Sequence, residues 1–303
     1  MAEARPDRVL RRYSEVSAAL RDPNLLIVGV RPQSQPEAGP PRAEIQAGLP
    51  AQRIAAWQER LEGLAHRIVD RLPSDRPLDL IAQFARPWGH AAAEMVTGIA
   101  ATDRLTQLAA EVSSATADPY DAELRARAAA ANSEMDAFFP GRIPPNDAST
   151  FVALSQTLVS LLANCWLPLV ERPDEIERLA ANPDWMPRAV EEMLRVAGVP
   201  RMVFRRGASG ERLTLMLADA NRDPDQFPDP DRLDISRTPA GQLSLGGWLH
   251  SCVGGPLIRM AIGVATAAWI PRFATVERST PVEWRGGPIL RWPAALLIRL
   301  KSA

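Results

Sequence analysis

One of the two cysteines in this chain, Cys252, lies between two glycine pairs in the stretch LGGWLHSCVGGPLIR, which runs from Leu245 to Arg259. A cysteine that follows a glycine-rich turn and opens a helix meets free backbone N–H groups and the positive end of the helix dipole, and both favour the thiolate. Because no second cysteine or histidine stands at a zinc-ligand spacing, a tetrahedral zinc site is not expected. A lone thiolate can still supply one axial bond to a haem iron, and the glycines would let a flat macrocycle approach the backbone.

The remaining candidate ligands have simpler interpretations. Cys252 itself could be an inert buried cysteine, and Cys165, in a strongly apolar segment, is predicted to belong to the core. His66 and His90 are predicted to be ordinary helix residues.

The composition limits the classes of function. The chain has 303 residues, a formal net charge of −1, 46% hydrophobic and 23% charged residues, which is typical of a soluble globular protein. No attraction to nucleic acid or to an anionic membrane is expected at this charge, and small neutral ligands fit better. Two distant cysteines and a charged start without an apolar signal core predict a cytoplasmic protein with free thiols.

Apolar residues recur at three- and four-residue spacing over most of the chain, so the sequence predicts a mainly α fold with small β-sheets. The long apolar segment Thr150–Val170 predicts a buried helix that is kinked or ended at Pro168. Proline-rich segments predict a loop at 32–50 and an ordered coil at 220–236. The other expected elements are strands at 7–13, 202–205 and 212–217, helices at 14–22, 51–72, 79–99, 121–139, 173–183 and 186–198, and a C-terminal hairpin at 281–300.

Two further segments precede the cysteine stretch. EEMLR carries Glu192 and Arg195 three residues apart, and ANRDPDQFPDPDRLDISR is the proline-rich coil. In this order and spacing, the three segments resemble those of a bacterial cytochrome P450, and looser likeness extends over most of the chain. The resemblance implies a truncated cytochrome P450 fold in one domain over residues 1–303, shortened at its N-terminus, in a lid region around 140–149 and at 204–213.

The resemblance also implies roles for individual residues. Cys252 would be the axial thiolate ligand of a haem b iron, and further residues would contact the haem. In this set Gly246 and Gly254 are loop glycines, His250 and Arg42 reach haem propionates together with Arg205 or Arg206, and Glu192, Arg195 and Arg232 form a structural ion network.

The sequence departs from the family at positions that matter for chemistry. Leu245 stands where the family has phenylalanine, and Trp248 stands where it has glycine, so the indole must either turn outward or fill the space of the macrocycle. ALSQT, ending at Thr157, aligns with a family motif whose acid–alcohol pair delivers protons to oxygen. Leu154 replaces its glycine and Gln156 replaces its acid, and a glutamine cannot relay a proton by ionising. Thr157 and Gln156 are the catalytic candidates, although Thr157 could equally be a core hydroxyl.

The main hypothesis is a haem-thiolate monooxygenase that acts on a small or medium apolar molecule in secondary metabolism. Its electrons would come from a ferredoxin-type partner, because the chain carries no flavin or NAD fingerprint. One alternative is a cytochrome P450 scaffold that has lost oxygen activation and performs a cyclisation or dehydration. The other is an accessory protein whose shortened lid exposes an apolar face to a partner enzyme.

Overall fold

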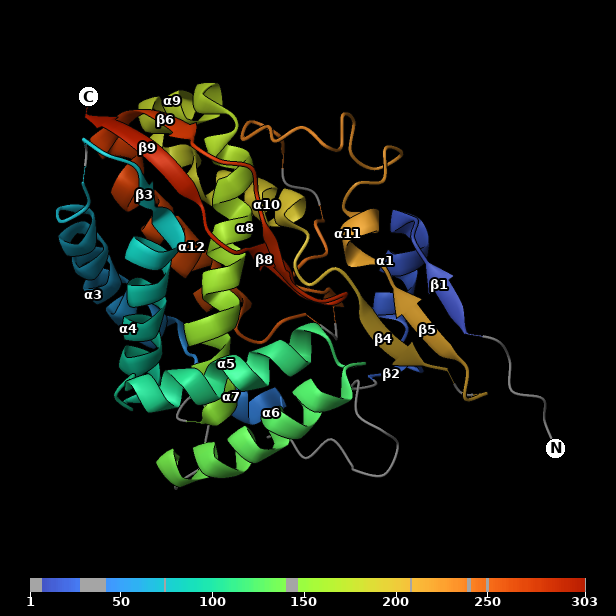
Figure 1. Ribbon diagram of the computed structural model, residues 1–303. Coiled ribbons are helices and arrows are strands. Elements are labelled where there is room, and N and C mark those ends of the chain that lie inside the picture. Colours follow the sequence, from blue (N-terminus) through green and yellow to red (C-terminus); the bar gives the residue numbers. More distant parts are fainter. Residues whose placement is uncertain are drawn as a thin grey trace.

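The computed structural model describes residues 7–27, 42–73, 75–139, 147–207, 209–238, 241–248 and 251–302. Among these residues helices dominate and three small sheets lie around them, as expected (Figure 1). The helices are α1 (Tyr13–Arg21), α2 (Arg42–Gly48), α3 (Ala51–Val69), α4 (Arg86–Thr97), α5 (Asp103–Ala117), α6 (Ala122–Met135), α7 (Ala148–Val152), α8 (Leu158–Val170), α9 (Pro173–Ala181), α10 (Met186–Ala197), α11 (Leu217–Ala220) and α12 (Gly255–Trp269). The strands are β1 (Arg8–Leu10), β2 (Leu26–Ile27), β3 (Leu78–Asp79), β4 (Val203–Arg206), β5 (Arg212–Leu215), β6 (Phe273–Arg278), β7 (Trp284–Gly286), β8 (Arg291–Pro293) and β9 (Leu297–Ser302).

The centre of the fold is a continuous helical rod made of α7, a π-helical turn at Ala153–Thr157, and α8. Every residue of α8 is buried except Pro168, because the segment is apolar on all sides. The helix does not end at Pro168, since it runs on to Val170. The rod is long and apolar enough to cross a membrane, yet 72% of its apolar 18-residue window is buried inside the protein, which is the behaviour of a core helix.

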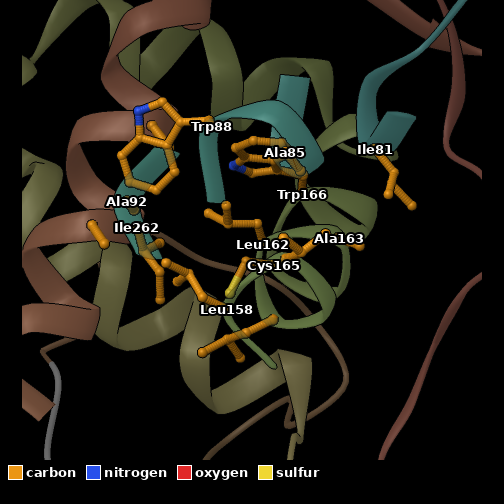
Figure 2. Packing of buried hydrophobic residues seen from close by; sticks show 14 of the residues in the cluster. Ile81, Ala85, Trp88, Ala92, Leu158, Leu162, Ala163, Cys165, Trp166 and Ile262 are labelled. Carbon is orange, nitrogen blue, oxygen red and sulfur yellow. The ribbon is translucent and has the colours of Figure 1, made fainter. Parts of the chain in front are cut away.

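Aromatic rings join the central rod to α12 and to the turn before α4. Trp166 of α8 stacks on Phe84 with ring centroids 5.4 Å apart and meets Trp269 of α12 edge-on at 6.1 Å. Its Nε1 donates a hydrogen bond of 3.0 Å to the Thr266 hydroxyl. Figure 2 shows the Cys165 sulfur inside this cluster, so the prediction that Cys165 is a core residue is confirmed.

Sheet topology corrects the expected C-terminal hairpin. β7 and β8 pair with each other, but β9 leaves them and lies between β3 and β6 in a separate sheet. The larger sheet has the order β1-β5-β4-β2, with β1 parallel to β5. Its inner face, together with α1, forms a second and smaller hydrophobic cluster that includes Leu20, Leu213 and Leu243.

Three local expectations also need correction. Residues 42–48 of the predicted proline-rich loop form α2, and residues 32–41 of that loop lie outside the described residues. Helix α5, which the periodicity analysis missed, begins at a Thr102 cap whose side chain accepts a hydrogen bond from the Leu105 amide. Helix α1 begins at Tyr13, one residue earlier than predicted, with Arg12 as its N-cap.

Candidate functional site

The stretch around Cys252 folds into a closed loop that leads directly into α12. The Cys252 amide donates a 2.6 Å hydrogen bond to the Leu245 carbonyl, and the Gly255 amide donates to the Cys252 carbonyl at 3.1 Å. Gly246 has a φ of 69°, a conformation that favours glycine. Cys252 is exposed, so the loop presents one of the two thiols of the chain while the core holds the other.

Two opposing effects act on the Cys252 thiol. Burial of the sulfur among loop atoms raises its pKa, although the residue as a whole is exposed at the surface. The Gly254 backbone N–H and the guanidinium groups of Arg42 and Arg259 lower the pKa, but they do not outweigh burial. The groups expected to favour the thiolate are therefore present, and in the protein alone the thiol form is favoured.

Two arginines hold the outer side of the loop. Arg42, at the start of α2, donates to the Ser251 carbonyl at 2.6 Å and to its hydroxyl at 2.9 Å. Arg21, at the end of α1, lies over the Trp248 indole with its guanidinium carbon 3.8 Å from the ring centroid. Trp248 is 44% exposed, so its ring turns outward. His250 lies outside the described residues.

The inner side of the loop is held by hydrogen bonds to one buried side chain, Asn221. Its Oδ1 accepts from the Leu243 amide at 2.7 Å, and its Nδ2 donates to the Ser244 hydroxyl at 2.8 Å. The Ser244 hydroxyl in turn donates to the Leu194 carbonyl of α10 at 2.7 Å. These contacts tie the loop to the helix behind it, and neither Asn221 nor Ser244 was predicted as a site residue.

Behind Asn221 lies a buried ion network centred on Glu192. The Arg195 guanidinium makes two 2.8 Å hydrogen bonds to the Glu192 carboxylate, and both side chains are almost fully buried. The third member is Arg237, whose Nε lies 3.3 Å from Glu192 Oε1. The expectation for Arg232 is corrected here, because Arg232 contributes its carbonyl, which accepts from Arg195 at 3.1 Å, while its side chain is exposed.

The catalytic candidates lie on the π-helical turn of the central rod. Thr157 is half-buried at its end. The Gln156 amide donates to the Thr106 carbonyl of α5 at 3.4 Å, so this side chain connects two helices. α4 crosses the turn so closely that a Cβ added at Gly89 would lie 2.5 Å from a Val159 methyl carbon.

The proposed propionate arginines lie on different elements. Arg42 lies beside the loop as described above, whereas Arg205 and Arg206 lie on β4, opposite Ile27 and Leu26 of β2. Arg205 is buried and donates to the Phe204 carbonyl at 2.7 Å.

The donor set around Cys252 fits a haem better than a metal held by protein ligands alone. Among the described residues, no group of three or more His, Cys, Asp or Glu side chains could hold a metal ion. One exposed sulfur suits a prosthetic group that brings its own nitrogen ligands. Gly254 keeps the space beside the sulfur open, since an added Cβ there would lie 3.9 Å from Cys252 Sγ.

Comparisons with known proteins agree with this geometry. The sequence matches no protein-family model. It is 26% identical to cytochrome P450 107B1 of Saccharopolyspora erythraea over 359 positions, covering 96% of this chain and 86% of the relative. It is 27% identical to the mycinamicin IV hydroxylase/epoxidase of Micromonospora griseorubida over 347 positions, covering 94% and 87%. Both alignments are longer than the 303 residues of this chain, so these relatives contain internal segments that the chain lacks.

Solved cytochrome P450 structures have the same fold as this chain. The crystal structure of P450BioI in complex with an acyl carrier protein ligated to hexadec-9Z-enoic acid superposes with a TM-score of 0.86 at 22% identity. The match covers 97% of this chain and 92% of that one. The chain is therefore similar to bacterial cytochrome P450s over nearly its whole length, and it has the fold of the solved cytochrome P450 structures.

Proposed function

We propose that the protein is a haem-thiolate oxidoreductase that carries out an oxidative tailoring step on a small or medium apolar molecule. The observation that carries the proposal is the placement of Cys252: an exposed thiol at the start of α12, in a loop held by Arg42 on one side and Asn221 on the other. The curated relatives include bacterial monooxygenases, among them a hydroxylase/epoxidase and a 6-deoxyerythronolide B hydroxylase.

In this proposal the Cys252 sulfur would hold the haem iron, and Arg42 would supply positive charge beside it. A bound haem would supply oxygen chemistry, which thiolate ligation directs towards O–O cleavage. The protein contributes a dry environment, because the central rod is buried along most of its length. Thr157 is the hydroxyl that can hold a proton at the π-helical turn.

The proposed partners follow from the missing flavin and NAD motifs and from the formal net charge of the chain. An external ferredoxin-type protein would deliver electrons, since the sequence holds no flavin or NAD motif. The net charge of −1 and the burial of the apolar rod support a protein that acts on a small molecule and not on nucleic acid or within a membrane.

Haem titration of three proteins tests this proposal. Wild type and Cys165→Ala should bind haem with the same stoichiometry and the same Soret maximum, because Cys165 is a core residue. Cys252→Ala should lose the thiolate-type spectrum and bind haem more weakly. A Cys252→Ala protein with the wild-type spectrum would contradict the proposal.

The glutamine at position 156 supports a second candidate function, which is non-redox chemistry such as a cyclisation or dehydration. Its amide cannot ionise, and it is engaged with the Thr106 carbonyl, so the acid step of oxygen activation has no acid at this position. Once a substrate is known, turnover in anaerobic buffer without a reductant would support this candidate. A requirement for both oxygen and electrons would refute it.

A further inference from the structure

Trp248 occupies a backbone conformation that non-glycine residues rarely adopt. Its φ is 50°, in the left-handed region, and it begins a turn that the Ser251 amide closes by donating to the Trp248 carbonyl at 3.2 Å. For a bulky aromatic residue this conformation costs free energy and persists only when surrounding contacts hold it. The turn that leads to Cys252 therefore needs a contact that compensates for Trp248.

The end of α1 supplies such a contact. The Arg21 guanidinium covers the exposed indole at 3.8 Å, which is a close cation–π geometry. The preceding residue, Leu20, is fully buried, and its Cδ1 would lie 3.9 Å from a Cβ added at Gly247. Leu20 and Leu243 belong to the same hydrophobic cluster, so the end of α1 that carries Arg21 is packed beside the loop.

The two arginine contacts fall on the two described sides of the turn. Arg21 acts on Trp248 and Arg42 acts on Ser251, the residue before Cys252. Without Arg21, Trp248 would still occupy its strained backbone conformation but would lose the cation–π contact that compensates for it. The turn before Cys252 would then open more often.

We propose that Arg21 is a positioning residue for Cys252, acting through the Trp248 indole. The stack holds a turn that a glycine in place of Trp248 would form without strain. This inference rests on the proposed function for its importance to haem ligation, but the contact can be tested on the protein without haem.

The test is the rate at which a thiol reagent such as 5,5′-dithiobis(2-nitrobenzoate) labels the haem-free protein at fixed pH. The reagent reports on Cys252, because Cys165 is fully buried and burial raises the pKa of its thiol strongly. Arg21→Ala should label about two- to five-fold faster, the range expected for loss of one cation–π contact near the surface. Arg21→Lys should fall between wild type and Arg21→Ala.

Two substitutions of Trp248 separate the stack from the strain. Trp248→Ala keeps the unfavourable φ and loses the ring, so it should label as fast as Arg21→Ala. Trp248→Gly removes the strain together with the ring, so it should label at about the wild-type rate. Adding Arg21→Ala to Trp248→Gly should then change nothing.

Arg53→Ala is the matched control, because Arg53 also faces an indole, that of Trp57 at 6.0 Å, but on α3. It should label as wild type does. Arg21→Ala should lower the melting temperature only slightly, since it loses one contact at the surface, and Trp248→Gly should not lower it, since the strain is removed together with the ring. A large drop in both variants would contradict a positioning role. Equal labelling rates for wild type, Arg21→Ala and Trp248→Ala would overturn the inference. Wild type that binds no haem would instead refute the proposed function and leave the labelling result standing.

Discussion

Replacing Glu192 with alanine removes the carboxylate that both Arg195 and Arg237 contact. Glu192 is 2% exposed and Arg195 is 1% exposed, so no bulk water can take the place of the carboxylate. Arg195 would keep three acceptors, the carbonyls of Asn221, Pro230 and Arg232 at 2.9, 2.6 and 3.1 Å, but no negative charge.

The expected cost follows from these contacts. Breaking a buried pair by removing one partner costs about 3–5 kcal/mol, because a buried charge is left uncompensated. The Asp234 amide, which donates to Glu192 Oε1 at 3.0 Å, also loses its acceptor and keeps the loss near the upper end of that range. Domains of 150–250 residues lose about 2–4 °C per kcal/mol. For this longer chain, the expected drop in melting temperature is on the order of 5–10 °C.

Thermal unfolding of purified protein, followed by circular dichroism, measures this cost. Glu134→Ala is the matched control, because Glu134 pairs with Arg104 at the exposed surface, where water and salt screen the charges and such pairs contribute little to stability. Combining Glu192→Ala with Arg195→Ala should cost less than the sum of the two single changes. A soluble Glu192→Ala protein that melts at the wild-type temperature would refute this account of the network.

Three further predictions follow from buried contacts elsewhere. Asn221→Ala should lower the free energy of unfolding by about 2–3 kcal/mol, because the Leu243 amide loses its acceptor; a loss below about 0.5 kcal/mol in urea titrations would contradict it. Gly89→Ala should cost about 1–3 kcal/mol through overpacking, and Val159→Ala should restore part of the loss; no recovery in the double variant would show that the cost has another origin. Burial lowers the pKa of His90, so the unfolded state takes up its proton first, and this contribution to stability is lost as pH falls below about 6.5. Unfolding of wild type and His90→Gln between pH 7 and 5 should differ in slope, and identical slopes would oppose it.

Much of the fold can be predicted from the sequence, because local patterns specify most helices. The apolar run at 150–170 and the amphipathic segment at 186–198 carry their own periodicity, and each forms a helix close to the expected bounds. β9 could not be placed in this way, because its partners β3 and β6 are chosen by tertiary pairing with strands far along the chain. The helix at 42–48 follows a proline-rich stretch whose composition favours a loop.

The site shows the same division between local and distant information. Cys252 and Glu192 lie in sequence motifs from which they can be identified. Asn221, Arg237 and Arg21 instead act through contacts with residues far away in the sequence. Arg237 lies five residues after Arg232 in the same coil, and only the three-dimensional path of the coil decides which of the two reaches Glu192. Trp248 is unusual in the sequence itself, but its contact with Arg21, more than 200 residues earlier, is formed only in the folded chain.

The most direct test of haem–thiolate ligation is the CO difference spectrum of the reduced, haem-loaded protein. The account predicts the long-wavelength Soret band that a ferrous haem gives with carbon monoxide when a cysteine thiolate is the opposite ligand. The band should appear in wild type and in Cys165→Ala and vanish in Cys252→His. Protein produced with ample haem that stays colourless, or that shows the same band without Cys252, would contradict the account.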